Sequence, residues 1–579
     1  ELNLGQFSSL GPLACWKACP IFKGCHDHII NKISSLRTSN SHTSPNFIQL
    51  TTKSLSTFTP ITLPELTKII NSMSSTTCSL DFIPTTLLKE FSNIFFPIFL
   101  HLVNLSLLTS KFPTDFKTST IIPLLKNSSL DSSFLSNYRP VTNLCFISKI
   151  LEKVVYLQLS SYLELNSLLP TTQSGFRVAH NTETSLLKIY NDAILASDSG
   201  YITLLFGLDY SSAFDTVDHN ILLSLLEKSF NITGSCISWL SSYLINRYST
   251  VVLKNSVSKS SAVAFGVPQG SILGPLLFIL YTSDLPRIIH SFSFNSQMYA
   301  DDSYIYTSFP KSELSVVMNN LSSCLTSVMS WSNSLFLKLN PSKFELICFN
   351  KSDQSLTLPS LNISSDLSLE FSSSIRSLGF VFDSTLSLSP QIRTVAKSSY
   401  FHLRRIKKLM PFLDDATLKL LVTSLILSRI DYCNSLYYGL PFSTLYPLNK
   451  AFNSAARLVA RAPLFSHISP FLLHLHWLPL KFRIIFKICT LMFKINNNIS
   501  PKYLNDLIVK PKRAGLRSSS SNHFFIISVR HSFAKSAFAF SGPLLWNSLP
   551  SSLTSSESLT LFRKGLKKHL FERFIEERC

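Results

Sequence analysis

Acidic residues are scarce in this chain, and their scarcity sets the first limit on its chemistry. Its 579 residues hold 33 Asp and Glu against 53 Lys and Arg, for a formal net charge of +20. With 45% hydrophobic and only 15% charged residues, the chain can build a large core and is not broadly disordered. The positive charge favours a polyanionic partner, either nucleic acid or an acidic membrane. Any catalytic acid must come from a short list.

Glycine and paired cysteines are also scarce. The chain holds 15 glycines, and seven of them fall within residues 175–274. Its 11 cysteines are an odd number scattered along the chain, so we expect no disulfide framework and a reducing intracellular compartment. One N-terminal group could bind zinc, but its spacing fits no familiar zinc pattern and a frayed segment is the favoured interpretation. Its members are Cys15, Cys19, Cys25, His26 and His28.

No apolar run is long enough to predict a membrane span. The two longest, Ile94–Val103 and Ile272–Tyr281, are interrupted by proline and are shorter than the ~20 residues that a spanning helix needs. We therefore expect no membrane partner. The sequence begins without methionine or a leader, so we expect it to be a fragment of a longer protein.

Apolar periodicity predicts a helical beginning, an α+β centre and a helical end. Helical spacing starts near Pro64 and recurs at 87–108 and 146–165. Between 200 and 350, short strands alternate with helices, which indicates a sheet covered by helices. The expected central elements are a buried strand at 201–208, a helix at 217–228, a strand at 250–257, a helix at 271–281, two β segments at 298–306 and a helix at 313–336. Beyond residue 390 the pattern is mainly helical until about residue 500.

The positive charge is concentrated near the C-terminus. Residues 481–579 contain 17 Lys and Arg but only 5 Asp and Glu, an excess of 12 within a total of +20. Such a segment is suited to binding phosphate groups.

Three pairs of adjacent acids occur, and only one has an apolar β context. Asp414-Asp415 precedes a helical run and is typical of a helix N-cap, and Glu576-Glu577 belongs to a solvated terminal helix. Asp301-Asp302 is flanked by tyrosines at the bend between two β segments. Two carboxylates in that position are costly unless they are exposed, paired or bound to a cation.

A further acid, Asp209, ends the apolar strand at 202–208. If one sheet brings Asp209 close to Asp301, the carboxylates repel each other unless divalent ions neutralise them. Two such ions ~3.5–4 Å apart can clamp the attacking and leaving oxygens of a phosphoryl transfer, and hard oxygen ligands suit Mg²⁺. From the spacing alone, simple hairpin caps remain an equal alternative.

A glycine-bracketed turn precedes the helix expected at 271–281. Gly266 and Gly270 enclose Val267-Pro268-Gln269, and glycine permits close approach of a ligand or another backbone. An ordinary turn before a helix is the alternative interpretation.

Together these motifs resemble reverse transcriptases, in the same order and spacing. The amino-acid sequence within and around the motifs is similar to that of the non-LTR (LINE-type) retrotransposon polymerases of the Jockey-like lineages. This similarity extends from about residue 60 onward. The central motifs that carry the resemblance are Asn137–Pro140, Gln173–Arg177, Ala213–His219, Gly266–Pro275 and Tyr299–Asp302. The motifs that resemble the tail of those elements are Asp431–Ser435, Asn453–Arg457, His476–Pro479 and Leu545–Pro550.

The resemblance implies catalytic roles. Asp209 and Asp301 would coordinate two Mg²⁺ ions, or Mn²⁺, with Asp302 alongside. Lys343 would protonate the pyrophosphate leaving group. Phe344 departs from the family, which usually has Thr there. Residues 377–380 fall where the family has its primer-grip turn.

The resemblance also implies a nucleotide site. The backbone carbonyl of Tyr210 would complete a metal site, and the ring of Phe214 would clash with a ribose 2′-hydroxyl and so favour deoxynucleotides. As an alternative, Phe214 is a core residue of the following helix. Gln269 and Gly270 would lie against the templating base and the incoming nucleotide.

Two basic residues, Lys126 and Arg139, would clamp the triphosphate from the fingers, although they could also be plain surface bases. The implied fold is α+β, a right-hand polymerase with fingers, palm and thumb. The expected segments are 1–60, a linker or extension; 61–119, a helical extension; 120–385, fingers and palm; 386–460, the thumb; and 461–579, a basic helical C-terminal region.

The implied function is an RNA-directed DNA polymerase acting by target-primed reverse transcription, in the nucleus or cytoplasm. Its partners would be an RNA template, a DNA primer or target, and dNTPs. The family's upstream endonuclease has no room before residue 60. The alternative is a truncated, inactive or domesticated copy that only binds nucleic acid. A membrane-surface protein is a third hypothesis, prompted by the weakly amphipathic stretch Arg563–Phe574.

Overall fold

The computed structural model places the described residues in two compact units that interleave along the chain. It describes residues 45–577 except 46, 128–129, 132, 135–136, 254–255, 352–357, 365–366, 464 and 511–522, so the group Cys15–His28 lies outside the described residues. The first unit comprises residues 1–170, 210–288 and 326–340, and the second comprises 171–209, 289–325 and 341–579. Because the units interleave, the segment boundaries expected from the sequence stay predictions.

Helices dominate the first unit. α4 (Leu63–Ser72) starts at a capping box in which Thr62 and Glu65 satisfy each other's backbone N–H groups. The single helix expected at 87–108 is wrong, because the chain breaks at Phe91 between α5 (Thr85–Glu90) and α6 (Ser92–Thr109). α7 (Phe146–Leu165) confirms the helix expected at 146–165. The other helices are α9 (His219–Lys228), α10 (Gly234–Leu244) and α11 (Gly274–Tyr281).

One mixed sheet completes the first unit. β1 (Thr118–Leu125) pairs antiparallel with β2 (Tyr138–Asn143) and parallel with β4 (Arg247–Leu253). β5 (Ser256–Val257) and β6 (Ser261–Val263) both pair antiparallel with β4. The single strand expected at 250–257 is therefore wrong, because the chain reverses between β4 and β5 and the alternation continues across the reversal.

One helix of the first unit passes a length and composition test for a membrane span. It is α6, with a mean hydropathy of 1.5 over 18 residues, of which 28% are buried. The core helices of soluble proteins pass the same test, so one such helix is weak evidence.

A four-stranded antiparallel sheet is central to the second unit. Its order is β7–β8–β3–β9, formed by β7 (Asn295–Tyr299), β8 (Asp302–Phe309), β3 (Ile202–Leu208) and β9 (Glu345–Phe349). Every residue of β3 is buried between two partner strands, which explains its largely apolar sequence. The strand and the two β segments expected here are confirmed. Helix α8 (Thr182–Asp198) packs against β3 and β7.

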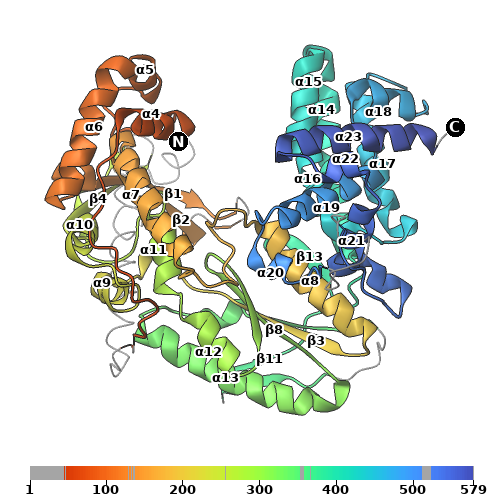
Figure 1. Ribbon diagram of the computed structural model, residues 1–579, viewed down its shortest axis with the longest axis horizontal. Coiled ribbons are helices and arrows are strands. Elements are labelled where there is room, and N and C mark those ends of the chain that lie inside the picture. Colours follow the sequence, from red (N-terminus) through yellow and green to blue (C-terminus); the bar gives the residue numbers. More distant parts are fainter. Residues whose placement is uncertain are drawn as a thin grey trace, which may run out of the picture. The chain divides into compact units, whose positions relative to one another are not determined.

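Two small hairpins and a set of helices complete the second unit (Figure 1). The hairpins join β10 (Leu361–Ser364) to β11 (Leu367–Leu369) and β12 (Ser374–Ser377) to β13 (Phe380–Asp383). The helices from residue 389 onward are α14 (Ser389–Leu409), α15 (Asp415–Val422), α16 (Ser428–Ile430), α17 (Phe442–Val459), α18 (Ser469–Leu475), α19 (Leu480–Asn496), α20 (Lys502–Asn505), α21 (Phe538–Asn547), α22 (Ser551–Thr554) and α23 (Leu559–Glu576). α12 (Leu285–Ser291) and α13 (Leu314–Ser334) contribute residues to both units. Asp414 caps α15 through the backbone N–H of Thr417, as expected.

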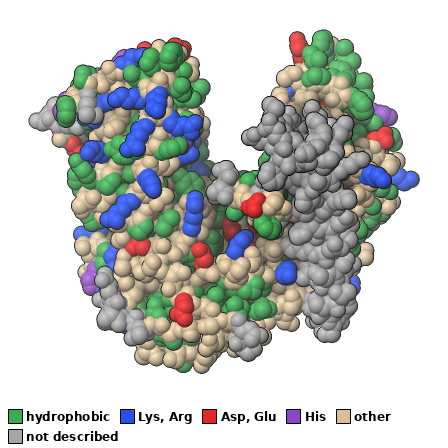
Figure 2. Space-filling view, turned by 180° about the vertical axis from the view of Figure 1, so that it is seen from behind, with side chains coloured by type: hydrophobic (Ala, Val, Ile, Leu, Met, Phe, Trp, Pro, Cys, Tyr) green, Lys and Arg blue, Asp and Glu red, His purple; other side chains and the backbone are tan. Residues whose placement is uncertain are grey.

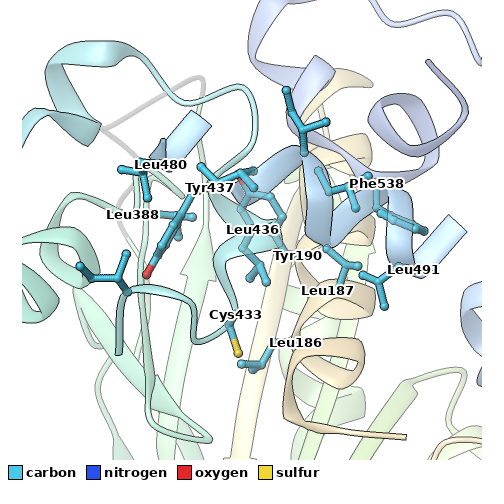
Figure 3. Packing of buried hydrophobic residues seen from close by; sticks show 14 of the residues in the cluster. Leu186, Leu187, Tyr190, Leu388, Cys433, Leu436, Tyr437, Leu480, Leu491 and Phe538 are labelled. Atoms are coloured by element: carbon cyan, nitrogen blue, oxygen red, sulfur yellow. The ribbon is translucent and has the colours of Figure 1, made fainter. Parts of the chain in front are cut away.

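The C-terminal segment shares one hydrophobic core with the sheet side of its unit. Leu186, Leu187 and Tyr190 of α8 pack in the same buried cluster as Leu491 of α19 and Phe538 of α21 (Figure 3). Polar contacts join the same elements, since Asp198 at the end of α8 accepts hydrogen bonds from the backbone N–H groups of residues 530 and 531. The described residues after 460 are thus part of the second unit's core and do not form a loose tail.

The seven cysteines among the described residues are all free thiols.

Candidate active site

Three carboxylates lie at one end of the second unit's sheet. Tyr299 pairs with Asp302, so Ala300 and Asp301 form a two-residue turn between β7 and β8. Asp209 directly follows β3, whose last residue pairs with Ser303 on β8. The register of the sheet therefore brings Asp209 to the hairpin that carries Asp301 and Asp302.

The three acids interact electrostatically. Burial, followed by repulsion from Asp301 and Asp209, raises the pKa of the Asp302 carboxyl to about 6, while Lys343 acts in the opposite direction. A raised pKa means that the ionised form is disfavoured where it stands. A cation placed between these carboxylates would relieve that cost.

Lys343 supplies one positive charge to this group. Its Nζ lies 2.9 Å from Oδ2 of Asp209 in a partly exposed ion pair. The next residue, Phe344, is buried, and its ring packs edge-on against Phe206 of β3 at a centroid distance of 5.2 Å. Phe344, which stands where the family usually has Thr, thus anchors the segment that carries Lys343.

The carboxylates form an open set of oxygen donors. Within the described part of the chain, no group of three or more His, Cys, Asp or Glu side chains is arranged to hold a metal ion on its own. Mg²⁺, however, binds through one or two carboxylates and keeps water and substrate phosphates as its other ligands. Asp209, Asp301 and Asp302 therefore fit Mg²⁺ that arrives with a nucleotide better than a permanently caged metal.

The turn between β7 and β8 is held by a buried amide. Ala300 has a φ of 57°, which is uncommon for a residue with a side chain. Oε1 of Gln173 accepts hydrogen bonds from the backbone N–H groups of Ala300 (3.0 Å) and Gly175 (2.8 Å), and its Nε2 donates to the Ala300 carbonyl (3.4 Å). One side chain thus binds both backbone groups of the residue before Asp301.

Residues 172–175 run beside β7 and support this clamp. The backbones of Ser174 and Met298 are hydrogen-bonded at 2.8 Å. A Cβ at Gly175 would collide with the backbone nitrogen of Ala300, so glycine is required there. The Ser174 hydroxyl lies 2.9 Å from the hydroxyl of Tyr503 in α20, which links the clamp to the C-terminal helices.

The first unit contains the residues predicted to bind the nucleotide. Phe214 lies in a short 3₁₀ turn, and its half-buried ring stacks on Phe278 of α11 at 4.5 Å between centroids. The Phe214 carbonyl accepts from the backbone N–H of Val267 at 2.8 Å. The predicted gate residue and the glycine-bracketed turn are therefore parts of one structure.

Gln269 and Gly270 are held between that 3₁₀ turn and the end of β2. Nε2 of Gln269 donates to Oδ1 of Asp215 (2.8 Å), and the Gln269 carbonyl accepts from the backbone N–H of Thr142 (2.8 Å). Gly270 has a φ of 140°, and a Cβ there would collide with the carbonyl oxygen of Thr142. A glycine is thus required at this position for both reasons.

A buried carboxylate holds the rest of the same loop. Glu152 of α7 is fully buried and accepts hydrogen bonds from the backbone N–H groups of Ile272 (2.7 Å) and Leu273 (3.2 Å), just before α11. Burial raises the pKa of Glu152, and the nearby Arg247 and the two N–H groups oppose that rise. Glu152 therefore holds the loop through two hydrogen bonds, although burial makes its ionised form costly in free energy.

Lys126 and Arg139 lie on one hairpin. Arg139 is on β2 opposite Leu124, and Lys126 follows β1 with its backbone N–H bonded to the carbonyl of Asn137. Both residues are exposed, as basic residues that bind a triphosphate must be. The backbone of Tyr210 pairs with Leu339 in the first unit.

The turn expected at 377–380 is a tight hairpin. Leu378 and Gly379 join β12 to β13 with φ values of 48° and 83°. The hydroxyl of Tyr432 donates to the Leu378 carbonyl. Tyr432 belongs to the tail motif Asp431–Ser435, which thus supports the hairpin directly.

Sequence reasoning assigned no role to Gln173, Asp215 or Glu152. Gln173 and Asp215 lie within the motifs that resemble reverse transcriptases, so the resemblance included both residues but implied no function for either. Glu152 had no such signal beyond a charge within an apolar helical pattern.

The central part of the chain is similar to a known family of polymerases. Residues 124–382 match the profile of the family described as reverse transcriptase (RNA-dependent DNA polymerase). The matched segment includes all the predicted site residues.

The similar proteins come from non-LTR retrotransposons. The chain is 29% identical over 306 residues to the probable RNA-directed DNA polymerase from transposon BS of Drosophila melanogaster, covering 52% of this chain and 33% of that protein. It is 36% identical over 177 residues to the X-element polymerase of the same species, covering 30% and 19%. It is 26% identical over 292 residues to the RNA-directed DNA polymerase from its mobile element jockey, covering 50% and 31%. The matched region thus spans a third or less of these relatives' length.

Proposed function

We propose that the protein is the RNA-directed DNA polymerase of a non-LTR retrotransposon. The observation that carries this proposal is the joining of Asp209, Asp301 and Asp302 at one sheet end, inside the segment that is similar to reverse transcriptases. The RNA template, the DNA primer or target and the dNTPs are its proposed partners. Target-primed synthesis, with the nick supplied by an endonuclease, and a nuclear or cytoplasmic location belong to the same proposal.

The chain's own residues divide the work of the reaction. Asp209, Asp301 and Asp302 would hold two Mg²⁺ ions, which supply charge stabilisation for the attack of a primer 3′-hydroxyl on the α-phosphorus of a dNTP. Lys343 is placed to donate a proton to the leaving pyrophosphate once it separates from Asp209. Gln173 keeps the turn that carries Asp301 in a single geometry.

The first unit would select the nucleotide. Phe214 is supported by Phe278 and would exclude a 2′-hydroxyl. Gln269 and Gly270 would face the template base and the incoming dNTP, and Lys126 and Arg139 would bind the triphosphate. In a right-hand polymerase these elements would be fingers and palm, and the helices after residue 389 would begin the thumb.

Template-dependent incorporation of dNTPs by the purified chain tests this proposal. With a primed RNA template and Mg²⁺, wild type should extend the primer, and Asp301→Asn should lose at least about 1,000-fold in rate, because a ligand of the catalytic ions is removed. Asp415→Asn is the matched control, since it also belongs to an adjacent acid pair but is 81% exposed at its side chain. Equal incorporation by wild type and Asp301→Asn would refute the role of that carboxylate.

A second candidate function is nucleic-acid binding without synthesis. It is favoured by the excess of 12 positive charges within residues 481–579. Phosphate-driven binding weakens log-linearly with salt. Tight, salt-sensitive binding together with no incorporation by wild type would support this candidate over the polymerase.

A further inference from the structure

A basic cavity lies among the C-terminal helices of the second unit, well away in sequence from the carboxylates. Its volume is about 380 Å³, within the usual range of ligand pockets of ~300–1,000 Å³. Its walls come from α19, α23, the turn after α18 and the helical stretch 423–434. The charged and aromatic lining residues are Asp431, His476, Trp477, Arg483, Phe486, Lys487, Arg563 and Lys567.

Positive charge exceeds negative charge in this lining. Asp431 is already paired with Arg483, whose Nε lies 2.8 Å from Oδ1 of the carboxylate. Lys487 is paired at 3.1 Å with Glu183. Among the described residues, neither Arg563 nor Lys567 takes part in an ion pair. Two cations on one face of α23 thus remain available to an anion.

The positively charged side chains in and around the cavity also repel one another. Partial burial, followed by repulsion from Arg483 and Lys419, lowers the pKa of Lys567. The pKa of Lys494 is lowered by burial first and then by repulsion from Arg563 and Lys487. An anion bound in the cavity would reverse this repulsion.

The cavity wall contains unusual backbone. The stretch Thr423–Leu427, two residues of which line the cavity, is a π-helical turn inserted between α15 and α16. His476 has a φ of 54°, and Cys433, next to the lining residue Asn434, has a φ of 51°. π-turns and strained residues of this kind concentrate at functional sites.

One buried polar atom in the wall lacks a partner. Oδ1 of Asn434, a fully buried residue that lines the cavity, accepts no hydrogen bond from the described residues. Such an atom costs free energy unless a ligand or water satisfies it. The tail motifs Asp431–Ser435 and His476–Pro479 therefore meet at a cavity whose wall contains both cations and an unsatisfied acceptor.

We propose that this cavity binds the phosphodiester backbone of a nucleic-acid strand, with Arg563 and Lys567 as its principal phosphate contacts. Arg can contact a phosphate through two N–H groups, and Lys adds a point charge. Phe486, which is half-buried in the wall, offers aromatic surface of the kind on which bases stack. Figure 2 shows further Lys and Arg side chains, with few acidic ones, over the helical part of the second unit at the left of that view.

A pair of double variants on one helix tests the proposal. Arg563→Ala with Lys567→Ala removes the two cavity cations, whereas Lys564→Ala with Lys568→Ala removes two cations at neighbouring positions of α23 that do not line the cavity. Both variants lose the same charge from the same helix. Binding of a labelled single-stranded RNA to the full chain is followed by fluorescence anisotropy over a range of KCl, with EDTA and without dNTPs.

The cavity variant should bind the RNA about tenfold more weakly at ~0.1 M salt, and the slope of log K against log salt should shrink by about 1.4, which is two phosphate contacts on a single strand. The control variant should stay within about twofold of wild type. A DNA strand of the same sequence shows whether the cavity distinguishes the two sugars. Equal binding by the two variants would overturn the proposal, as would a cavity variant that loses affinity for inorganic phosphate but not for RNA.

This proposal goes beyond the polymerase function and can fail separately from it. The binding assay needs neither metal nor nucleotide, so a chain inactive in primer extension can still show the cavity effect. Matching thermal unfolding curves of both double variants would show that any lost binding is not lost folding.

Discussion

In each unit, one buried side chain holds a backbone segment next to the predicted site residues. The side chain is a neutral amide in one unit and a carboxylate in the other. In the second unit the neutral amide of Gln173 binds Ala300, next to the carboxylates. In the first unit the carboxylate of Glu152 binds the backbone before α11. In both cases the holding residue is more than a hundred residues from its partner in the chain.

The difference follows from the local charge of each unit. The turn held by Gln173 carries Asp301, and the pKa of Asp302 is already raised by its neighbours, so another carboxylate there would add repulsion. Glu152 instead has the cation Arg247 nearby and accepts two backbone N–H bonds, which favour its charged form. A neutral clamp suits a site that must bind cations, and an anionic one suits the start of a helix.

The largest expected effect is on stability in the first unit. Glu152→Ala should lower the free energy of unfolding by about 3 to 5 kcal/mol, because it leaves two buried N–H groups without an acceptor and removes the negative charge near Arg247. Urea unfolding followed by tryptophan fluorescence measures this. A loss below about 1 kcal/mol would mean that water replaces the carboxylate and that Glu152 does not hold the loop.

Glu152 also predicts a pH dependence. Its pKa is raised in the folded chain above the unfolded value of about 4.3, so its contribution to stability is complete below that pH and is lost as pH rises through the folded pKa. Glu152→Gln does not titrate. The stability of wild type relative to this variant should therefore fall as the pH rises above about 4.3, and a constant difference would contradict the raised pKa.

Replacing the neutral amide of Gln173 by a carboxylate should have the next largest effect. Gln173→Glu should slow dNTP incorporation at least about 100-fold, equivalent to about 2.7 kcal/mol, and should raise the Mg²⁺ concentration for half-maximal activity. Gln173→Leu should slow incorporation without changing the Mg²⁺ requirement, because it removes the hydrogen bonds but adds no charge. Gln49→Glu, at an exposed glutamine far along the chain from the site, is the control. Wild-type rates in Gln173→Leu would show that the clamp has no positioning role.

Variants of Lys343 separate its proposed role as a proton donor from its ion pair with Asp209 in the second unit. Because its ion pair with Asp209 is partly exposed, Lys343→Gln should change stability by less than about 1 kcal/mol. Incorporation should nevertheless fall about 10- to 100-fold through loss of the proton donor. Lys343→Arg keeps the ion pair but releases a proton poorly, so full recovery in this variant would assign the residue to pairing alone.

The smallest effect is expected at Phe214 in the first unit. Phe214→Val should reduce the preference for dNTPs over NTPs by about tenfold, about 1.4 kcal/mol, and leave the Mg²⁺ requirement unchanged. Competing dNTP and NTP incorporation measures the preference. Phe442→Val, at an exposed ring on α17, is the control. An unchanged preference would mean that Phe214 serves mainly to pack against Phe278.

Local patterns predicted elements and motifs better than they predicted connections. α7 and the β7–β8 hairpin follow from periodicity because each buries one continuous face. The break at Phe91 and the reversal between β4 and β5 escaped prediction, since apolar periodicity continues across both. The carboxylates were found through tyrosine flanks, a strand end and family register, because acidic pairs as such occur elsewhere in the chain.

The sequence by itself determined which acids could serve a metal, where the apolar strands and helices lie, and that residues 124–382 are similar to reverse transcriptases. Only the tertiary structure decided which residues hold those acids in place and that the C-terminal segment shares a core with α8. It also gathered the tail motifs around one basic cavity. The physical reason is that burial and hydrogen bonding join residues hundreds of positions apart, such as Ser174 and Tyr503, and no local spacing records such a contact.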